Sequence, residues 1–149
     1  MPQRTKQTPF RLDTHPFFWF GRIFGLRNRA LNREMRPFGL DYQRMKVLAV
    51  LKEYPGCSMQ QLSDLTVVDR TSLTHTVQLL VKKGFVHRES RETDRRSVVL
   101  ALTAGGQKAY GKIAPMILKL NARSMAGFTE KEKTELLSQL RRIVDNLKE

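Results

Sequence analysis

The residues best suited to chemistry are four polar side chains in the stretch 69–84, which recur at helical spacing. Thr71, His75, Gln78 and Lys82 are three or four positions apart, so they share one face of an α-helix. Together they offer a hydroxyl, an imidazole, an amide and an ammonium group, but no carboxylate. Because solvated helix faces usually mix Glu with Lys, this composition favours an acidic partner, with a plain solvated face as the alternative.

The helix that must position these side chains has a signal at each end. Asp69 can accept hydrogen bonds from the free N–H groups of the first turn, and Gly84 can adopt the left-handed conformation that ends a helix. Leu73, Val77 and Leu80 follow at the same spacing on the other face. We therefore expect one amphipathic helix between Asp69 and Gly84, with its apolar face buried.

A shorter helix is expected just before it. Ser58 and Gln61 match a capping box, and Leu62 and Leu65 are expected to point inward from the helix that this box opens. Residues 66–68 then form the turn into the next helix. Two helices joined by a turn of three or four residues, the second with a polar outer face, form a helix-turn-helix.

The periodicity changes after this helix-turn-helix. Residues 85–89 and 97–102 are rich in residues that favour strands, and residues 90–96 between them are polar. We expect a β-hairpin with a charged tip.

Long apolar helices are expected toward both ends of the chain. Residues 13–36 carry five aromatic side chains, and residues 129–149 open with a second capping box and carry a leucine-rich stripe. A further helix over 103–126 contains Pro115, which should bend it, and Asp41 caps a buried helix before the helix-turn-helix. The terminal helices carry more apolar surface than a small domain needs for its own core, so we expect a second subunit.

The chain is strongly basic. Its 149 residues include 27 Lys plus Arg against 14 Asp plus Glu, which gives a formal net charge of +13. Such a balance fits a polyanionic partner, most commonly nucleic acid, although an unspecialised basic surface is the alternative. Residues 1–46 hold ten basic and three acidic side chains, so part of the excess must serve another purpose or tether phosphates.

Cysteine usage and apolar runs indicate the compartment. Cys57 is the only cysteine, which excludes an intramolecular disulfide and fits a reducing compartment. It falls in the turn before Ser58, where a structural role is favoured over redox sensing. No apolar run is long enough for a signal peptide or a membrane span. We expect a cytoplasmic protein without membrane contact.

Several short motifs give the chain a family resemblance. The most specific are Asp94-x-Arg96 followed by Leu102-Thr103-x-x-Gly106, together with Val68-Asp69-Arg70 and Lys82-Lys83-Gly84-Phe85-Val86. With the order of elements from Asp13 onward, they resemble the MarR family of bacterial winged helix-turn-helix transcription regulators. The resemblance implies a mainly α fold with a small β-hairpin wing and with long N- and C-terminal dimerisation helices.

The resemblance also implies how the chain is divided. We expect an arm over residues 1–12 and a single MarR-like domain over 13–149, in which 13–36 and 104–149 are dimerisation helices and 41–103 bind DNA.

Relatives of this kind are obligate homodimers on pseudo-palindromic operators in double-stranded DNA, and most release DNA when a small molecule binds. We therefore expect a ligand-released repressor; the alternative is a constitutive architectural DNA- or RNA-binding protein without an effector.

Candidate DNA contacts lie on the helix expected between Asp69 and Gly84, here called the reading helix, and on the hairpin. Hydroxyl, imidazole and amide groups suit base edges, whereas basic side chains suit phosphates. Arg96 resembles the wing arginine that enters the minor groove, with Asp94 orienting it; an exposed ion pair of little consequence is the alternative. The expected contacts are Arg70, Thr71, Ser72, Thr74, His75, Gln78, Lys82, Arg88, Arg91, Asp94, Arg95 and Arg96. Thr74-His75 and Gln78-Leu79 depart from the pattern of many relatives, so the operator sequence does not carry over.

A candidate effector site lies on the first long helix. His15, Phe18, Trp19 and Arg22 are spaced to share one face, and Met45 on the next helix could close the site. An aromatic wall beside a cation and an imidazole would suit a planar aromatic acid or its thioester. The alternative is dimer core.

Other chemistry finds little support. Residues 106–112 match most of a phosphate-binding P-loop, but Ile113 stands where Ser or Thr must hold magnesium. The three histidines lack metal-ligand spacing, and no nucleophile with a base can be assembled. We expect no enzyme activity, no cofactor and no metal.

Overall fold

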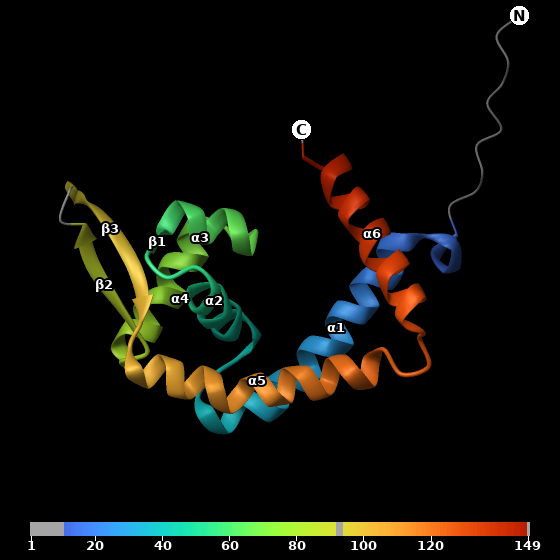
Figure 1. Cartoon of the computed structure of the whole chain (residues 1–149), viewed down its shortest axis with the longest axis horizontal. Coiled ribbons are helices and arrows are strands. Elements are labelled where there is room, and N and C mark those ends of the chain that lie inside the picture. The colour runs from blue at the N-terminus through green and yellow to red at the C-terminus, as the bar shows by residue number, and fades with distance from the viewer. Residues whose placement is uncertain (1–10, 92–93, 149) are drawn as a thin grey trace, which may run out of the picture. The chain divides into compact units, whose positions relative to one another are not determined.

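The computed structural model describes residues 11–91 and 94–148, and within the strands it does not describe the side chains of 90–97. The chain forms two compact units, Met1–Ile113 and Ala114–Glu149. In chain order the elements are η1 (Leu12–Thr14), α1 (Pro16–Met35), η2 (Arg36–Phe38), α2 (Tyr42–Glu53), β1 (Cys57–Ser58), α3 (Met59–Thr66), α4 (Arg70–Lys82), β2 (Val86–Arg91), β3 (Asp94–Leu102), α5 (Ala104–Ser124) and α6 (Glu130–Asn146) (Figure 1). Apart from Arg11 and Leu12, the expected arm lies outside the described residues.

Three short helices, α2, α3 and α4, form the helix-turn-helix part of the first unit, beside the sheet (Figure 1). Each begins with the cap that the sequence predicts. The Asp41 carboxylate accepts from the Arg44 N–H at 2.8 Å, Ser58 and Gln61 form both bonds of a capping box, and Asp69 accepts from the Ser72 N–H at 2.9 Å. These bonds satisfy backbone donors that helix ends otherwise leave free, which fixes where each helix starts.

Large apolar side chains meet between these helices and the sheet. Leu73, Val77 and Leu80 of α4 are fully buried, as expected, and the other core side chains come mainly from α2, α3 and β3. One expectation for α3 is wrong: Leu62 is buried, but Leu65 is 45% exposed. Thr66 takes the inner position at the end of α3, where its hydroxyl donates to the Leu62 carbonyl at 2.6 Å.

The turn between α3 and α4 begins one residue later than expected, because Thr66 is still helical. Val67 follows in the left-handed region with φ of 51°, and it is 90% exposed. A β-branched residue in this conformation is strained, so surrounding contacts must hold it.

The sheet has three strands in the order β1-β3-β2, all antiparallel, where only a hairpin was expected. Cys57 and Ser58 pair with Leu100 and Val99. Two residues are too few to show the alternation that marks a strand, which is why the sequence did not reveal β1. The hairpin strands also reach further toward the tip than expected, to Arg91 on one side and from Asp94 on the other.

The start of α5 is fastened to the base of the wing. Thr103 caps α5, since its Oγ1 accepts from the Gly106 N–H at 2.9 Å and also donates to the Gly84 carbonyl at 2.5 Å. Gly84 has φ of +70°, as predicted for the end of α4. The wing and α5 therefore share one rigid corner. Further along, α5 remains a single helix through Pro115.

α1 begins at Pro16 rather than at Asp13 or Thr14, because η1 occupies those residues. Leu31 and Met35 toward its C-terminal end are buried, whereas several apolar side chains nearer its start are exposed, including Phe17, Trp19 and Ile23 at 53%, 47% and 59%.

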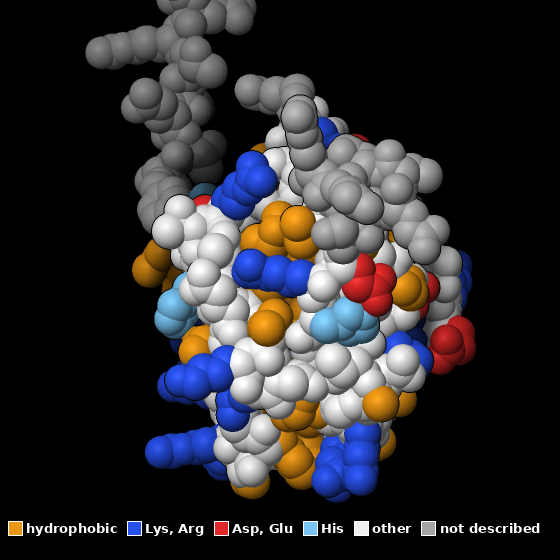
Figure 2. Space-filling model, turned by 90° about the vertical axis from the view of Figure 1, so that its left-hand side faces the viewer, with side chains coloured by type: hydrophobic (Ala, Val, Ile, Leu, Met, Phe, Trp, Pro, Cys, Tyr) orange, Lys and Arg blue, Asp and Glu red, His pale blue; other side chains and the backbone are white. Residues whose placement is uncertain are grey.

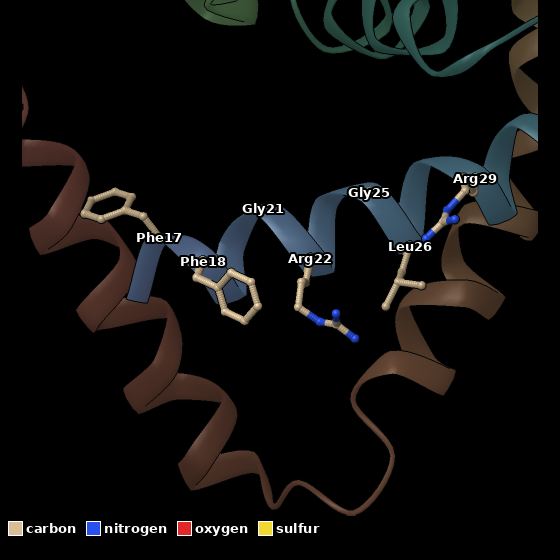
Figure 3. Close-up of a pocket in the computed structure, with 7 residues that line it drawn as sticks. All are labelled: Phe17, Phe18, Gly21, Arg22, Gly25, Leu26 and Arg29. Carbon is tan, nitrogen blue, oxygen red and sulfur yellow. The ribbon is translucent and has the colours of Figure 1, made fainter. Parts of the chain in front are cut away.

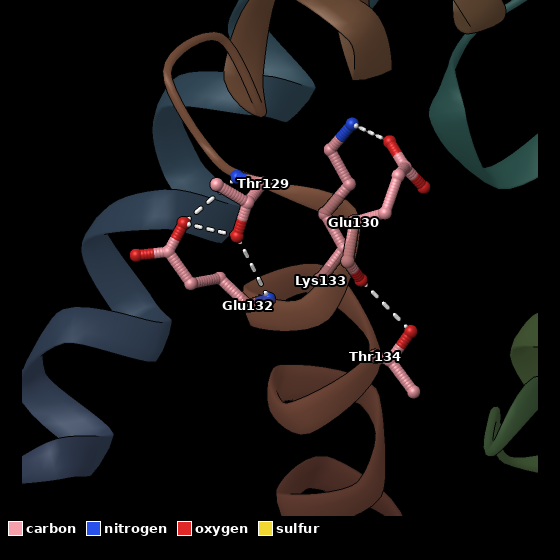
Figure 4. A network of polar contacts seen from close by, with 5 residues as sticks. All are labelled: Thr129, Glu130, Glu132, Lys133 and Thr134. Carbon is pink, nitrogen blue, oxygen red and sulfur yellow. Dashed lines mark hydrogen bonds and ion pairs between the residues drawn. The ribbon is translucent and has the colours of Figure 1, made fainter.

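The second unit contains α6, which opens with the predicted capping box (Figure 4). The Glu132 carboxylate accepts from the Thr129 N–H at 2.7 Å, and Thr129 Oγ1 accepts from the Glu132 N–H at 3.2 Å. Leu137, Val144 and Leu147 on its apolar stripe are at least half exposed. None of the helices within the described ranges is long and apolar enough to cross a membrane.

Candidate nucleic-acid interface and effector site

The polar face of α4 is turned outward. Thr71, His75, Gln78 and Lys82 are all exposed, and so are Arg70 and Ser72 near the start of the helix. Their positions match the expected reading face, because the buried stripe of α4 occupies the opposite side. The face can donate and accept hydrogen bonds along its whole length, as base edges and phosphates require.

Thr74 differs from its neighbours on the reading helix. It is only half-buried, and its Oγ1 donates to the Arg70 carbonyl at 2.7 Å. The hydroxyl proton is therefore already engaged inside α4, and only the oxygen lone pairs are left to accept from a base. This places Thr74 at the margin of the reading face.

A carboxylate, that of Asp69, lies at the start of α4. Hydrogen bonds from Ser72 hold the pKa of the Asp69 carboxyl below its usual value. The negative charge of Asp69 therefore stabilises the start of α4, which is the positive end of the helix dipole.

The wing supplies further basic residues. Arg88 lies exposed on β2, and the neighbouring His87 Nε2 contacts Glu89 Oε1. Four expected contacts, Arg91, Asp94, Arg95 and Arg96, have their backbones in β2 and β3, but their side chains lie outside the described part. Arg91 pairs with Asp94 across the strands, beside a register shift at Ser90/Arg91. Figure 2 shows the side of the molecule formed by this sheet and the helix-turn-helix, where blue side chains are spread widely and red ones are few.

Lys46 is a contact that sequence reasoning missed. Its ammonium donates to the Thr66 carbonyl at the end of α3, and burial lowers the pKa of Lys46. This bond ties α2 to the residue just before the strained Val67. It helps to fix the turn that sets α4 against α3.

On α1 the structure brings three of the expected effector residues together. The Arg22 guanidinium carbon lies 5.8 Å from the ring centre of Phe18 and 5.9 Å from that of Trp19. The two rings meet edge to face at 5.4 Å, and Trp19 Nε1 donates to the Asp13 carbonyl at 2.9 Å. Cation–π contacts of this kind hold a guanidinium in place while its N–H groups stay available.

A hollow of about 440 Å³ runs along the same helix (Figure 3). Its lining residues are Phe17, Phe18, Gly21, Arg22, Gly25, Leu26 and Arg29. Gly21 and Gly25 have no side chains to fill the hollow, and Arg22 and Arg29 give its lining a positive charge.

The remaining expected effector residues do not line this hollow. His15 is the residue just before α1, Trp19 contacts Arg22 without lining the hollow, and Met45 is buried in α2 with 5% exposure. Sequence reasoning missed Leu26 and Arg29, although continuing the helical spacing beyond Arg22 would have found them.

Cys57 is buried in β1, and burial raises the pKa of its thiol. A buried thiol with little thiolate character reacts slowly, which agrees with a structural role. Within the described ranges no three His, Cys, Asp or Glu side chains gather where they could hold a metal ion.

Known proteins share the sequence pattern and the fold of this chain. The model of the MarR family matches residues 38–97. The HTH-type transcriptional repressor IacR of Pseudomonas putida is 25% identical over 138 residues, which cover 93% of this chain and 83% of IacR.

Solved structures agree with this match. A MarR family transcriptional regulator from Silicibacter pomeroyi is 28% identical, with a TM-score of 0.84 and 93% of each chain covered. CouR from Rhodococcus jostii RHA1, solved with p-coumaroyl-CoA bound, shares the fold at 21% identity, with a TM-score of 0.82 over 91% of this chain and 95% of CouR. With its helix-turn-helix and three-stranded wing, this chain matches the MarR family of DNA-binding transcription regulators in sequence over residues 38–97 and in fold over most of its length.

Proposed function

We propose that this regulator is a homodimeric repressor, released from a pseudo-palindromic operator when a small aromatic acid or its thioester binds. The observation that carries the effector part is the cluster of Arg22, Phe18 and Trp19 on α1, of which Phe18 and Arg22 line the hollow. A guanidinium whose N–H groups bond to no other described residue suits a carboxylate, and flat rings beside it suit an aromatic body.

Dimerisation is supported by apolar side chains that the single chain leaves exposed. On α1 these include Phe24 and Leu26, at 51% and 55%, and on α6 they include Leu137 and Val144, at 53% and 52%. Monomeric proteins rarely expose such surfaces along whole helices, so a second copy of the chain is the natural cover.

A twofold dimer presents two copies of α4. Two such helices read two half-sites, which must lie one helical turn of DNA apart, about 34–36 Å, or a multiple of it. This requirement is why we propose a pseudo-palindromic operator rather than binding without sequence preference.

Two relatives support the regulatory part. IacR is named a repressor, and CouR was solved with p-coumaroyl-CoA, the thioester of an aromatic acid. An effector can weaken operator binding only by its differential affinity for the free and DNA-bound shapes, typically about 1–3 kcal/mol.

The first test compares DNA from beside the regulator's own gene with random duplex at one salt concentration. We expect preference for the operator by about a thousandfold or more. Equal affinities would favour a constitutive architectural protein instead.

The second test is calorimetry with benzoates, cinnamates and their thioesters, followed by operator binding. We expect one class to bind and to weaken operator affinity, and Arg22→Ala to remove this response while ligand-free DNA binding persists. Arg33→Ala is the matched control, because Arg33 lies on α1, is exposed and does not line the hollow. No binding by any compound, or an unchanged response in Arg22→Ala, would mean that these residues form part of the dimer core and not an effector site.

A further inference from the structure

A second hollow of about 440 Å³ lies in the first unit, where α1 ends, α2 begins and α4 ends. It shares no lining residue with the hollow on α1. Its lining residues are Asn32, Arg36, Gly39, Leu40, Asp41, Arg44 and Lys83. None of them is among the expected DNA or effector contacts.

The lining of this hollow is positively charged. Arg36, Arg44 and Lys83 contribute three positive charges and Asp41 one negative charge, so the net charge is 3 − 1 = +2. Both oxygens of Asp41 are already engaged, since Oδ1 accepts from the Arg44 N–H at 2.8 Å and Oδ2 from Arg44 Nη1 at 2.7 Å. The one carboxylate thus orients Arg44, and among the described residues it forms no ion pair with Arg36 or Lys83.

One donor of this lining lacks an acceptor. Arg44 Nε is buried and has no hydrogen-bond partner among the described residues. A buried unpaired donor of a charged group is costly, so a missing acceptor is the simplest explanation for its being there.

The backbone is shaped to admit Lys83. Gly39 has φ of +65°, and a Cβ at this position would lie 2.6 Å from Lys83 Nζ. The ammonium therefore lies over the bare backbone of Gly39. Asn32, another lining residue, is fixed as well, because its Oδ1 accepts from the Tyr42 N–H at 2.7 Å.

We propose that this hollow is an oxyanion site that takes a phosphate group, supplied by the DNA backbone or by a soluble phosphate compound. A phosphate offers several acceptor oxygens, which match the Arg36 guanidinium, the unpaired Arg44 Nε and the Lys83 ammonium, and its charge balances the net charge of the lining. Lys83 directly follows α4, so a DNA strand that passes the end of the reading helix comes near the hollow. The site gives a purpose to Arg36 and Arg44, which belong to the basic excess outside α4.

The test uses the full-length protein and three variants, Arg36→Gln, Lys83→Gln and the control Arg33→Gln. Arg33 is exposed on the same stretch of chain but does not line the hollow. All three changes remove one positive charge from an exposed side chain, and thermal melting will show that each variant is folded.

In the first arm, pyrophosphate is titrated by calorimetry in a buffer free of phosphate. If the site serves a soluble phosphate, the wild type and Arg33→Gln bind, and Arg36→Gln and Lys83→Gln bind about tenfold more weakly or worse.

In the second arm, the affinity for operator DNA is measured against salt concentration. If the site serves the DNA backbone, the log–log slope flattens by about one unit in Arg36→Gln and in Lys83→Gln but not in Arg33→Gln. If Arg36→Gln and Lys83→Gln but not Arg33→Gln are affected in one arm, the result supports the site and shows whether its phosphate group comes from a soluble compound or from DNA. Equal behaviour of all three variants in both arms overturns the proposal.

Discussion

At the scale of single residues, the helix caps could be predicted directly from the sequence. Asp41, Ser58, Asp69 and Thr129 each bond to the backbone three positions on, so a short stretch of sequence was enough to predict them. The bond from Lys46 to the Thr66 carbonyl joins residues twenty positions apart and depends on how α2 and α3 pack. No local pattern marks such a contact, which is why sequence reasoning missed it.

The cap at Asp69 predicts a pH dependence of stability. Because the folded-state pKa lies below the ordinary value of 3.8, the charged cap stabilises the fold above that pH, and this contribution is lost as pH falls through the folded-state pKa. Asp69→Asn keeps a capping oxygen but cannot titrate. Urea unfolding at a series of acidic pH values should therefore show a smaller loss of stability in Asp69→Asn than in the wild type, whereas parallel profiles would contradict the role given to the charge.

At the scale of elements, helical periodicity predicted most of the fold, and the misses have physical causes. β1 is too short for a pattern, and it forms because Cys57 and Ser58 meet the edge of β3, some forty residues later. Leu65 is apolar yet exposed, because Thr66 closes the inner face at the end of α3. The contact of Arg22 with Phe18 and Trp19 was predicted from spacing within one helix, whereas the second hollow joins three helices and could not be predicted in this way.

The junction of α5 with the wing gives an element-scale prediction. A Cβ at Gly106 would lie 1.9 Å from the Phe85 carbonyl oxygen, a backbone atom that cannot move aside cheaply. Gly106→Ala should therefore destabilise the fold by about 1–3 kcal/mol or more. Gly111→Ala, in the same helix with nothing within 4 Å, should instead stabilise it by about 0.5–1 kcal/mol. Chemical unfolding of both variants checks the pair, and equal effects would mean that α5 does not press against the wing.

At the scale of the whole molecule, two kinds of surface stand out. The outward face of α4 and the second hollow are basic and polar, whereas α1 and α6 expose aromatic and aliphatic side chains. Basic surface draws the protein to DNA of any sequence, but reading a two-half-site operator needs two copies of α4 held at a fixed spacing. In the dimer that we propose, the apolar surface holds the two copies together, so specific binding should depend on residues far from the DNA.

The last prediction tests that dependence. Leu137 and Val144 are exposed on the apolar stripe of α6, so changing both to Glu should leave the helix content intact but keep the protein monomeric at concentrations where the wild type dimerises. Ser138→Glu adds a charge to the opposite face of α6 and should remain a dimer. Sedimentation measures the assembly and footprinting measures the operator contact. The monomeric variant should bind random duplex but protect no complete operator, as should a protein that lacks residues 128–149. Protection of both half-sites by such a monomer would mean that operator recognition does not need α6.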